Sequence, residues 1–500
     1  MKNKFLYLLT ASVLFLGACK KGYLDVNTNP NSVTAVTSPL LLTGALNNTA
    51  AITTGGDIFY SFASLWMNYW MTPGGVSGWY EERSYNFTTN WSGSTVLWAN
   101  GYNNIFDYTT LEKQAKTENN AFYQGIAKTM KAWDYHYLVD FYNNVPYSQA
   151  SKSVTFITPK YDKGQDIYED LAKQLDSAVI LFQKTETLTA AQMAADIYNG
   201  GNRKQWAKFA NTLKLRILLR QSEIPGRDTY IKAEIAKITA NGAGYLSTGE
   251  SVTNQPGYSN VAGKQNPFYA NFGYDVNGAR TSGHNYKLAS TYGLNFLEDN
   301  NDPRLGRLYS KVNDDAGTGY VSLVWGQEVG ANQTVATVSS IGHGLIRSFD
   351  QDQYMMTDFE SLFIQAEAAQ RGWISGNAQA LYESAVTANF LYLDLTKEQA
   401  NEYLTNEAVA QWASNSDKIA LIIKQKWAAM NGTNDIEPWT DYRRLELPAD
   451  MPISIASTVS TRKIPVRMLY PQAEYNTNRA NVVAEGTVNQ FTSRIFWDVK

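Results

Sequence analysis

Apolar side chains recur at intervals of three and four residues along much of the chain, which is the spacing of one face of an α-helix. The clearest stripes lie in residues 118–142, 165–182 and 204–220. In the third stripe, apolar residues cover most of the helix circumference, a pattern typical of a helix that packs on several sides. The basic residues of this helix are expected to mark its remaining solvent-facing edge: Lys214, Arg216 and Arg220.

The helical pattern returns towards the C-terminus, in residues 359–385. Here Ala378 precedes Tyr382 by four positions, and Ala178 precedes Phe182 in the same way. This step from a small to an aromatic residue matches the second helix of a tetratricopeptide repeat. The chain is therefore predicted to be mostly α, with a tetratricopeptide-like helix-pair scaffold. A helical bundle without repeats is the alternative.

Two stretches interrupt the helical pattern. Residues 71–93 are rich in glycine and aromatic residues, and residues 240–350 mix Gly, Asn, Tyr and Thr without a helical period. The second stretch contains a strand-like piece, residues 320–325. We expect these stretches to form irregular loops and short strands. Because loops on a rigid scaffold commonly carry binding residues, they are where a ligand site is expected.

The N-terminus has the layout of a secretory signal: a short basic start, an apolar run over residues 5–16, and small residues before Cys19. The apolar run is too short to cross a bilayer core, which needs ~20 residues. Residues 16–19 also resemble the bacterial lipobox, and Cys19 is the only cysteine of the chain. We therefore expect residues 1–18 to be removed as a signal peptide, with lipidation of Cys19.

Composition narrows the classes of partner. The formal net charge is −3 and the pI is about 5.8, so no basic stripe is available to attract phosphate backbones, and nucleic acid is not expected as a partner. A single cysteine excludes an internal disulfide. The 13 Trp and 32 Tyr are the informative excess, because flat rings with a polar edge suit sugar faces and hydrated interfaces. Most of these rings are nevertheless expected in the core.

Motifs of catalysis are largely missing from the sequence. The glycine spacings in residues 257–264 and 342–347 depart from those of phosphate and dinucleotide loops. His136 and Asp140 lie one helical turn apart, but no second ligand pair accompanies them, so we expect His136 to be a helix-surface or packing residue. No catalytic residue, metal or cofactor is predicted. A carboxylate pair of a glycosidase leaves no spacing signature, so that alternative stays open.

Several blocks, in order along nearly the whole chain, resemble the SusD/RagB family of nutrient-binding outer-membrane lipoproteins. They are Leu24–Asn31, Ala132–Tyr147, Trp206–Arg216, Asp302–Leu305, Ala366–Ala368, Trp439–Leu445 and Ile464–Pro471. The resemblance implies a SusD-like scaffold that carries a large irregular subdomain. It also implies a partner, a SusC-like TonB-dependent barrel, to which the lipoprotein delivers a captured glycan or peptide at the cell surface.

The sequence patterns and the family resemblance together predict five parts of the chain. They are a signal peptide (1–18), a lipidated cysteine with an extended tether (19–39), an N-terminal helical part (40–239), an irregular ligand-facing insertion (240–350), and a C-terminal helical part with an irregular tail (351–500). Arg443 and Arg444, beside Trp439, are expected to be structural and to pair with acids of neighbouring helices.

The predicted ligand site rests on loop aromatics and nearby polar groups, because sugar faces stack on rings while hydroxyls need hydrogen-bond partners. The candidate residues are Trp79, Tyr80, Tyr85, Asn90, Trp91, Tyr274, Asn277, Arg280, Asn285, Tyr286 and Trp325. For each ring, core packing is the competing interpretation. Two other functions compete with nutrient binding: a scaffold lipoprotein that binds only a protein partner, and a surface glycosidase.

Overall fold

The computed structural model describes residues 36–500, apart from 55–56, 77, 153, 329 and 331–332. The predicted signal peptide, Cys19 and most of the predicted tether lie outside the described residues. The first described helix, α2, begins at Ser38.

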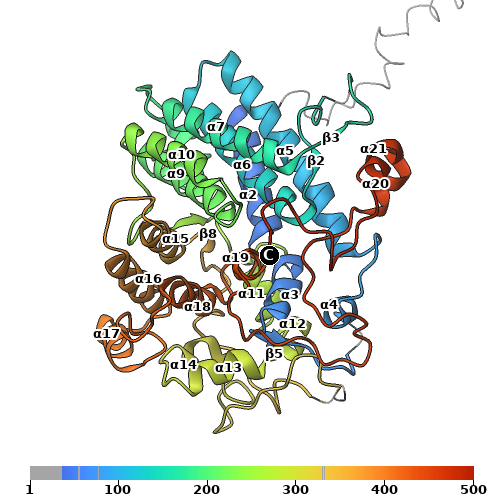
Figure 1. The fold of residues 1–500 in the computed structure, drawn as a ribbon, viewed down its shortest axis with the longest axis vertical. Coiled ribbons are helices and arrows are strands. Elements are labelled where there is room, and N and C mark those ends of the chain that lie inside the picture. The colour runs from blue at the N-terminus through green and yellow to red at the C-terminus, as the bar shows by residue number, and fades with distance from the viewer. Residues whose placement is uncertain (1–35, 55–56, 77, 153, 329, 331–332) are drawn as a thin grey trace, which may run out of the picture.

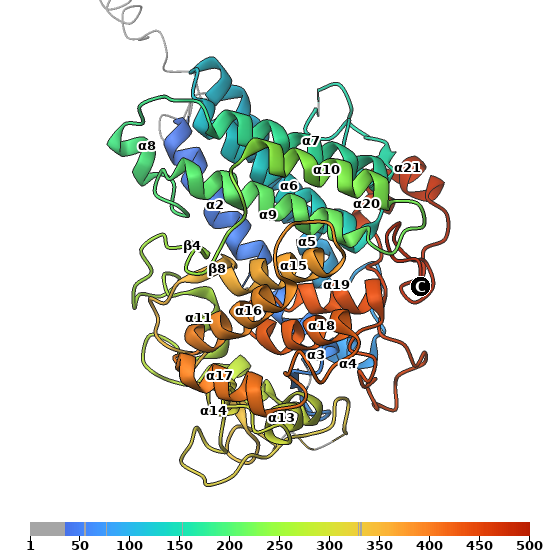
Figure 2. The ribbon, with the colours of Figure 1, turned by 60° about the vertical axis from the view of Figure 1, so that its left-hand side comes forward.

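One end of the molecule is a stack of long helices (Figures 1 and 2). Its members are α2 (Ser38–Thr53), α5 (Ser92–Thr117), α6 (Ala121–Tyr142), α7 (Gly164–Phe182), α9 (Arg203–Arg220) and α10 (Asp228–Asn241), with a short α8 (Ala190–Ala194). The three stripes predicted from periodicity correspond to α6, α7 and α9. Asn120 and Asn202 cap α6 and α9 by accepting hydrogen bonds from backbone N–H groups three residues on. Neighbouring helices of the stack pack against each other in sequence order, as helix pairs do.

A second group of helices follows in the C-terminal part. It comprises α15 (Asp358–Gln370), α16 (Ala378–Tyr392), α17 (Lys397–Asn406), α18 (Lys418–Met430) and α19 (Ile436–Leu445), with α20 (Gln472–Thr477) and α21 (Arg479–Ala484) in the tail. Helix α15 packs on α16, α18 and α9, so the two groups share one scaffold. The prediction of a mostly α, tetratricopeptide-like scaffold is confirmed.

The irregular subdomain lies in the lower part of Figure 1. Its helices are short: α3 (Asp57–Trp66), α4 (Tyr80–Ser84), α11 (Pro267–Phe272), α12 (Ser282–Tyr286), α13 (Thr291–Glu298) and α14 (Leu305–Leu308). Three antiparallel strand pairs belong to it: β1 (Trp70–Met71) with β5 (Leu288–Ala289), β4 (Val252–Asn254) with β8 (Gln353–Met356), and β6 (Tyr309–Ser310) with β7 (Ser340–Ile341). A fourth pair, β2 (Val145–Pro146) with β3 (Tyr161–Asp162), joins the ends of α6 and α7. The strand-like residues 320–325 make one isolated bridge, Leu323 to Ser290.

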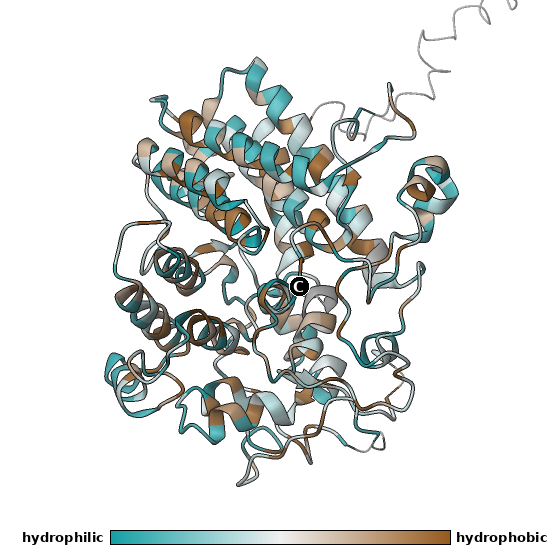
Figure 3. Cartoon of the chain, in the orientation of Figure 1, coloured by the Kyte–Doolittle hydropathy of each residue, from teal (hydrophilic) through white to brown (hydrophobic). Residues whose placement is uncertain are grey.

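Figure 3 shows that polar and apolar residues are interspersed along the helices. The largest apolar cluster joins α2, α5, α6, α7 and most of α9 to the irregular subdomain. Eight tryptophans are among the largest fully buried side chains. The expectation that most aromatic residues belong to the core therefore holds.

The prediction that Lys214, Arg216 and Arg220 mark a solvent-facing edge of α9 is wrong. All three are at most 2% exposed. Arg220 pairs with Asp140 (3.2 Å) and Glu437 (2.6 Å), and Lys214 pairs with Asp176 (2.6 Å) and Glu234 (2.8 Å). Buried charges are tolerated when carboxylates from neighbouring helices neutralise them, so this helix is enclosed on its charged side as well.

Arg216 extends the same ionic network towards the C-terminal helices, because it pairs with Glu360 of α15 and lies 3.8 Å from Glu437 of α19. Lys426 of α18 completes the cluster at Glu437 (3.8 Å). We call these residues the central ion network: Asp140, Arg216, Arg220, Glu360, Lys426 and Glu437. It ties α9 to α15, α18 and α19 through charge pairs in the interior.

The structural role predicted for the two arginines of α19 is confirmed. Arg444 pairs with Glu367 of α15 at 2.5 Å, as predicted for a contact between helices. Arg443 is held differently: it donates to the backbone carbonyl of Asp140 (2.5 Å) and lies over the ring of Trp439 (3.5 Å). Both are buried by neighbouring helices and by the C-terminal tail, whose Trp497 contacts Arg443.

His136 is also a packing residue, as expected. Its side chain is fully buried in α6, and burial together with the positive charges of Arg216 and Arg220 holds the pKa of His136 well below its ordinary value. Asp140, one helical turn from His136, is bound by Arg220 and by the indole of Trp497 (2.9 Å). In the described part of the chain no group of three or more His, Cys, Asp or Glu is placed to hold a metal ion.

Candidate functional site

Three loops that are far apart in sequence meet at Tyr85. Its hydroxyl accepts hydrogen bonds from the indole nitrogen of Trp325 (3.0 Å) and from the backbone N–H of Ser454 (3.0 Å). The hydroxyl of Ser454 in turn donates to the carbonyl of Arg83 (2.7 Å). The two predicted loop regions thus come together, and a third segment after α19 joins them.

Close approach of these loops depends on Gly326. A Cβ at this position would lie 2.2 Å from the hydroxyl oxygen of Ser454 and 2.7 Å from the backbone nitrogen of Ile455. Its φ of 82° also falls in the region that side chains disfavour. Glycine therefore lets the backbone beside Trp325 lie directly against the third segment.

A cavity of about 440 Å³ opens beside this junction, and we call it the aromatic pocket. It is lined by Asn68, Ser290, Thr291, Tyr292, Asn295, Phe296, Asp299, Asn300, Val324, Trp325, Lys424, Asp450 and Pro452. Its volume lies within the roughly 300–1,000 Å³ of pockets that hold small ligands. Helix α13 supplies one wall with Tyr292 and Phe296, because residues four apart lie on the same helix face.

A charged triad crosses the mouth of the aromatic pocket. Lys424 of α18 donates to the hydroxyl of Tyr292 (2.6 Å) and pairs with Asp450 (3.1 Å), while the Tyr292 hydroxyl donates to Asp450 (2.7 Å). The ammonium of Lys424 also lies over the rings of Tyr292 (4.8 Å) and Phe296 (5.0 Å). These contacts fix the ring of Tyr292 in one orientation at the rim.

Burial and charge set the protonation states of this triad. Burial lowers the pKa of Lys424, and Asp450 offsets part of that effect. Burial alone would raise the pKa of Asp450, but hydrogen bonds from Tyr292 and Lys424 and the charge of Lys424 outweigh it, so this pKa lies below its usual range. Burial and the bond to Asp450 raise the pKa of Tyr292. At neutral pH the pocket rim therefore carries an ammonium, a carboxylate and a neutral phenol.

This arrangement suits recognition of a polar ligand with apolar faces. The rings of Tyr292 and Phe296 and the buried edge of Trp325 provide apolar contact, while the amides of Asn68, Asn295 and Asn300 offer donors and acceptors. A mostly apolar lining with a few converging polar groups is the usual composition of small-molecule sites.

Of the predicted ligand residues, Trp325 lines this pocket, at its floor and only 1% exposed. Tyr85 and Trp91 are core residues, with exposed fractions of 0% and 6%. Tyr85 is held by the loop junction, and Trp91 packs against Phe62 and Phe87. The physical reason is that the first loop folds inward onto α3. The rings of Tyr85 and Trp91 therefore pack in the core and are not available to a ligand in the aromatic pocket.

The other predicted residues of the first loop lie near the surface, outside the pocket lining. Trp79 is half-buried at the start of α4 with a φ of 58°, next to Tyr80, which is 44% exposed. Asn90 is exposed. The ligand role predicted for these three stays a prediction.

Residues predicted in the second loop form a separate polar cluster centred on Asp314. Arg280 pairs with Asp314 at 2.7 Å, and the hydroxyl of Tyr274 donates to the same carboxylate at 3.3 Å. His284 contacts its other oxygen at 2.9 Å. The predicted Tyr274 and Arg280 are thus brought together, but at a carboxylate of the protein itself.

The remaining second-loop candidates lie beside this cluster. Asn277 is exposed, and its backbone N–H donates to Asp275 (2.8 Å). Asn285 and Tyr286 are half-buried in and beside α12, and the Asn285 carbonyl accepts from Val335 (3.3 Å). None of the three lines the aromatic pocket.

Sequence reasoning missed most of the pocket wall. Tyr292 and Phe296 are aromatic residues four apart inside a stretch that was treated as irregular, and their spacing was the available signal. Lys424 directly follows the apolar run 419–423, but α18 also carries Lys418 and Lys426, so the local sequence does not set Lys424 apart. Nothing in the local sequence points to Asp450, because it joins the site only through the fold.

Among the described residues, no helix combines the length and apolar character that crossing a membrane requires.

Comparison with known structures places the fold. A chitin-binding SusD homolog from Flavobacterium johnsoniae aligns with a TM-score of 0.77 at 22% identity, over 92% of this chain and 99% of that one. A SusD/RagB family protein from Bacteroides thetaiotaomicron aligns with a TM-score of 0.75 at 21% identity, covering 93% and 99%. A SusD homolog from Bacteroides fragilis gives 0.74 at 23% identity, covering 93% and 99%.

A comparison with curated proteins found no match. The model of one protein family, a SusD-like family described as starch-binding and associating with the outer membrane, matches residues 30–471. That span includes the N-terminal helical stack, α15 to α19, the irregular subdomain and every residue of the aromatic pocket. The chain therefore belongs to the SusD-like family, as its sequence blocks suggested.

Proposed function

We propose that this protein is a cell-surface nutrient-binding lipoprotein that captures a glycan in the aromatic pocket. The observation that carries the proposal is the wall of Tyr292, Phe296 and Trp325 facing asparagine amides and the Lys424–Asp450 pair. Sugar rings present aliphatic hydrogens to such walls and hydroxyls to such amides. The starch-binding description of the family and the chitin-binding relative support a glycan over a peptide.

Delivery to a SusC-like TonB-dependent barrel in the outer membrane is the second part of the proposal. It is supported by the family's association with the outer membrane and by the lipobox-like residues that end in Cys19. A lipid anchor on Cys19 would hold the binding protein and the transporter at high effective concentration, so that capture and uptake are coupled without tight binding.

Asp450, which together with Asp299 is one of the two carboxylates that line the pocket, is unsuited to general-acid catalysis, which supports binding over cleavage. A glycosidase needs one carboxyl group that stays protonated near neutral pH to act as general acid. Asp450 has the opposite tendency, since Tyr292 and Lys424 hold its pKa low. Its two partners also occupy the carboxylate, which fits a structural anchor at the pocket rim.

The test is a titration of the purified protein with pools of maltooligosaccharides, chitooligosaccharides and peptides, followed by tryptophan fluorescence. Trp325 at the pocket floor and Trp427 next to Lys424 should report occupancy. A saturable change with a glycan pool, and no new products in the mixture, is the expected result. Saturation with peptides alone would replace the glycan by a peptide ligand, while product formation would revive the glycosidase alternative.

A further inference from the structure

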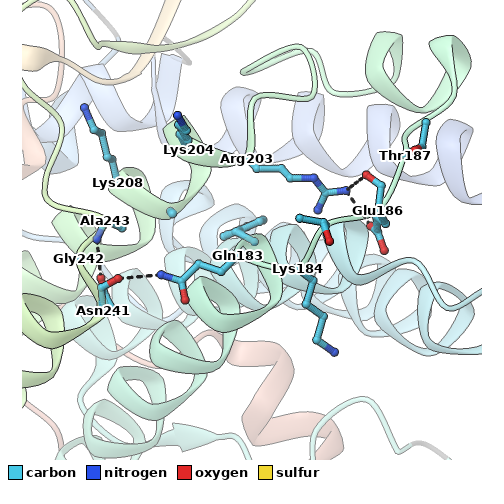
Figure 4. Close-up of a pocket in the computed structure, with 13 residues that line it drawn as sticks. Gln183, Lys184, Glu186, Thr187, Arg203, Lys204, Lys208, Asn241, Gly242 and Ala243 are labelled. Carbon is cyan, nitrogen blue, oxygen red and sulfur yellow. Dashed lines mark hydrogen bonds and ion pairs between the residues drawn. The ribbon is translucent and has the colours of Figure 1, made fainter.

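A second cavity, of about 880 Å³, lies on the helical stack, far along the chain from the aromatic pocket (Figure 4). It is lined by Phe182, Gln183, Lys184, Thr185, Glu186, Thr187, Arg203, Lys204, Ala207, Lys208, Asn241, Gly242 and Ala243. We call it the basic groove. It lies between the C-terminal ends of α7 and α10 and the first turns of α9.

The walls of the groove are fixed by hydrogen bonds between helix ends. Gln183, which follows α7, donates through its side chain to the carbonyl of Asn241 at the end of α10 (2.8 Å). The side chain of Asn241 accepts from the backbone N–H of Ala243 (3.0 Å). Glu186 accepts from Arg203 (3.0 Å) and from the first two N–H groups of α6 (3.0 and 2.8 Å). The cavity is therefore a preformed feature of the scaffold.

The groove is positively charged, although the chain as a whole is acidic. Four of its lining residues are cations: Lys184, Arg203, Lys204 and Lys208. Glu186 neutralises Arg203, and Glu250 neutralises Lys208 at 2.5 Å. Lys184 and Lys204 are exposed, and within the described ranges neither makes an ion pair. Two uncompensated ammonium groups at one cavity favour an anionic occupant.

Two features indicate what kind of anion fits. Figure 4 shows Lys184 and Lys204 on opposite sides of the groove, so a ligand that reaches both needs anionic groups spread along its length. Among the lining residues Phe182 is the only aromatic, and at 3% exposure its ring offers no free face for a sugar to stack on. A flexible chain with spaced carboxylates satisfies both conditions.

We propose that the basic groove binds an acidic, extended peptide segment of a protein partner. Carboxylates of the segment pair with Lys184 and Lys204, and its backbone reaches the polar rim at Thr185. This site is distinct from the aromatic pocket, and its occupancy does not depend on which ligand that pocket takes.

The test measures binding of fluorescein-labelled hexaglutamate to the purified full-length protein by fluorescence anisotropy at low salt. Replacing both free lysines, Lys184→Glu with Lys204→Glu, should weaken binding at least about tenfold, because attraction becomes repulsion at two contacts. The matched control, Lys113→Glu with Lys173→Glu, makes the same charge change at exposed lysines of α5 and α7 outside the groove. It should leave the affinity within about twofold, as surface charges at a distance are screened.

Three further measurements keep the outcome clear. Circular dichroism and thermal melting should show both double variants folded like the unmodified protein, since all four lysines are exposed. Labelled hexaglutamine should not bind, because it lacks the charges. Equal binding of hexaglutamate to the groove variant and the control would overturn the proposal. Binding of oligogalacturonate with no binding of hexaglutamate would overturn it as well, by assigning the groove to an anionic glycan.

Discussion

The aromatic pocket and the basic groove differ in the kind of side chain that lines them. The pocket has rings for walls, and its lysine is already paired with Asp450 and enclosed by Tyr292 and Phe296. The groove has two exposed lysines without an ion-pair partner among the described residues, Lys184 and Lys204, and its one ring is buried. A cation that is internally neutralised orients its neighbours, whereas a free cation is available to an outside partner.

The difference also follows the two parts of the fold. The pocket is assembled from loops and a short helix of the irregular subdomain with α18, while the groove is formed by the ends of long helices. Shape-dependent recognition of a small ligand needs many chain segments to converge at one point. Recognition of an extended charged segment needs only a rigid edge, which a helix stack provides.

The largest expected effect comes from removing one charge of the central ion network, which joins the two regions. Glu437 lies 2.6 Å from Arg220 and 3.8 Å from both Arg216 and Lys426, and these cations hold its pKa below the usual range against the effect of burial. The change Glu437→Gln leaves three buried cations short of a counter-charge, and should lower the free energy of unfolding by about 3–5 kcal/mol. Urea denaturation measures this.

Because the central ion network contains residues of both α9 and α18, both binding activities should be lost together in that variant as denaturant rises. Glu402→Gln, at an exposed glutamate of α17, is the matched control and should change stability little. Loss of one region with the other intact would show that the two parts unfold independently.

The next effect separates the two sites. Tyr292→Ala removes a wall of the aromatic pocket and the hydroxyl that joins Lys424 to Asp450. Affinity for the bound oligosaccharide pool should fall roughly tenfold to a hundredfold, as for an aromatic residue at the centre of a binding site. Isothermal titration calorimetry measures this change.

Tyr80→Ala serves as the control, since that ring is exposed and outside the pocket lining. Hexaglutamate binding at the basic groove should be the same in both variants. If Tyr80→Ala lowers glycan affinity as much as Tyr292→Ala does, the ligand lies on the first loop and the aromatic pocket is not the site.

A smaller effect depends on pH and concerns the interior behind the pocket. Asp435 is 5% exposed, and burial raises its pKa to about 7, although the N–H of Gly432 and the charge of Lys287 oppose the shift. The folded protein then holds this proton more tightly than the unfolded chain does. Stability from Asp435 is therefore fully present below the unfolded-state pKa and declines as pH rises towards 7.

The variant Asp435→Asn should remove this decline. Relative to the unmodified protein, it should gain about 1–3 kcal/mol in free energy of unfolding between pH 5 and pH 8, since each pKa unit corresponds to about 1.4 kcal/mol. Urea denaturation at the two pH values measures the difference. An identical pH dependence in the two proteins would show that Asp435 is ionised without cost.

The smallest expected effect is a difference in salt dependence between the two sites, and measuring it needs no mutation. Raising the ionic strength from about 0.05 M to about 0.5 M shortens the screening length several-fold and weakens contacts between exposed charges. Hexaglutamate affinity should drop several-fold, whereas glycan affinity should change by less than about twofold. Equal salt dependence at both sites would contradict the assignment of apolar contact to one and charge to the other.

Much of the fold was accessible from the sequence, because helical periodicity is a local property. The stripes at residues 118–142, 165–182 and 204–220 correspond to α6, α7 and α9. The irregular character of residues 240–350 was predicted as well. The environment of α9 was not, since whether a basic residue faces water or a buried carboxylate depends on helices that are remote in sequence.

The candidate site was less accessible. Clustering of aromatic residues in loops pointed to the irregular subdomain, where the candidate pocket also lies, but ring type alone does not say which rings pack inward. Tyr85 and Trp91 pack in the core, and only an edge of the Trp325 ring reaches the pocket floor. The wall of Tyr292 and Phe296 was overlooked because its helix has only eight residues.

The sequence by itself determined the helical scaffold and the SusD-like family, since both are written in spacing and in ordered blocks along the chain. Tertiary structure alone decided which side chains share a site. Asn68, Tyr292, Lys424 and Asp450 meet at one pocket although they are distributed over most of the chain. The same long-range contacts neutralise Lys424 and leave Lys184 free, because a charge pair forms only where the fold brings its members within a few ångströms.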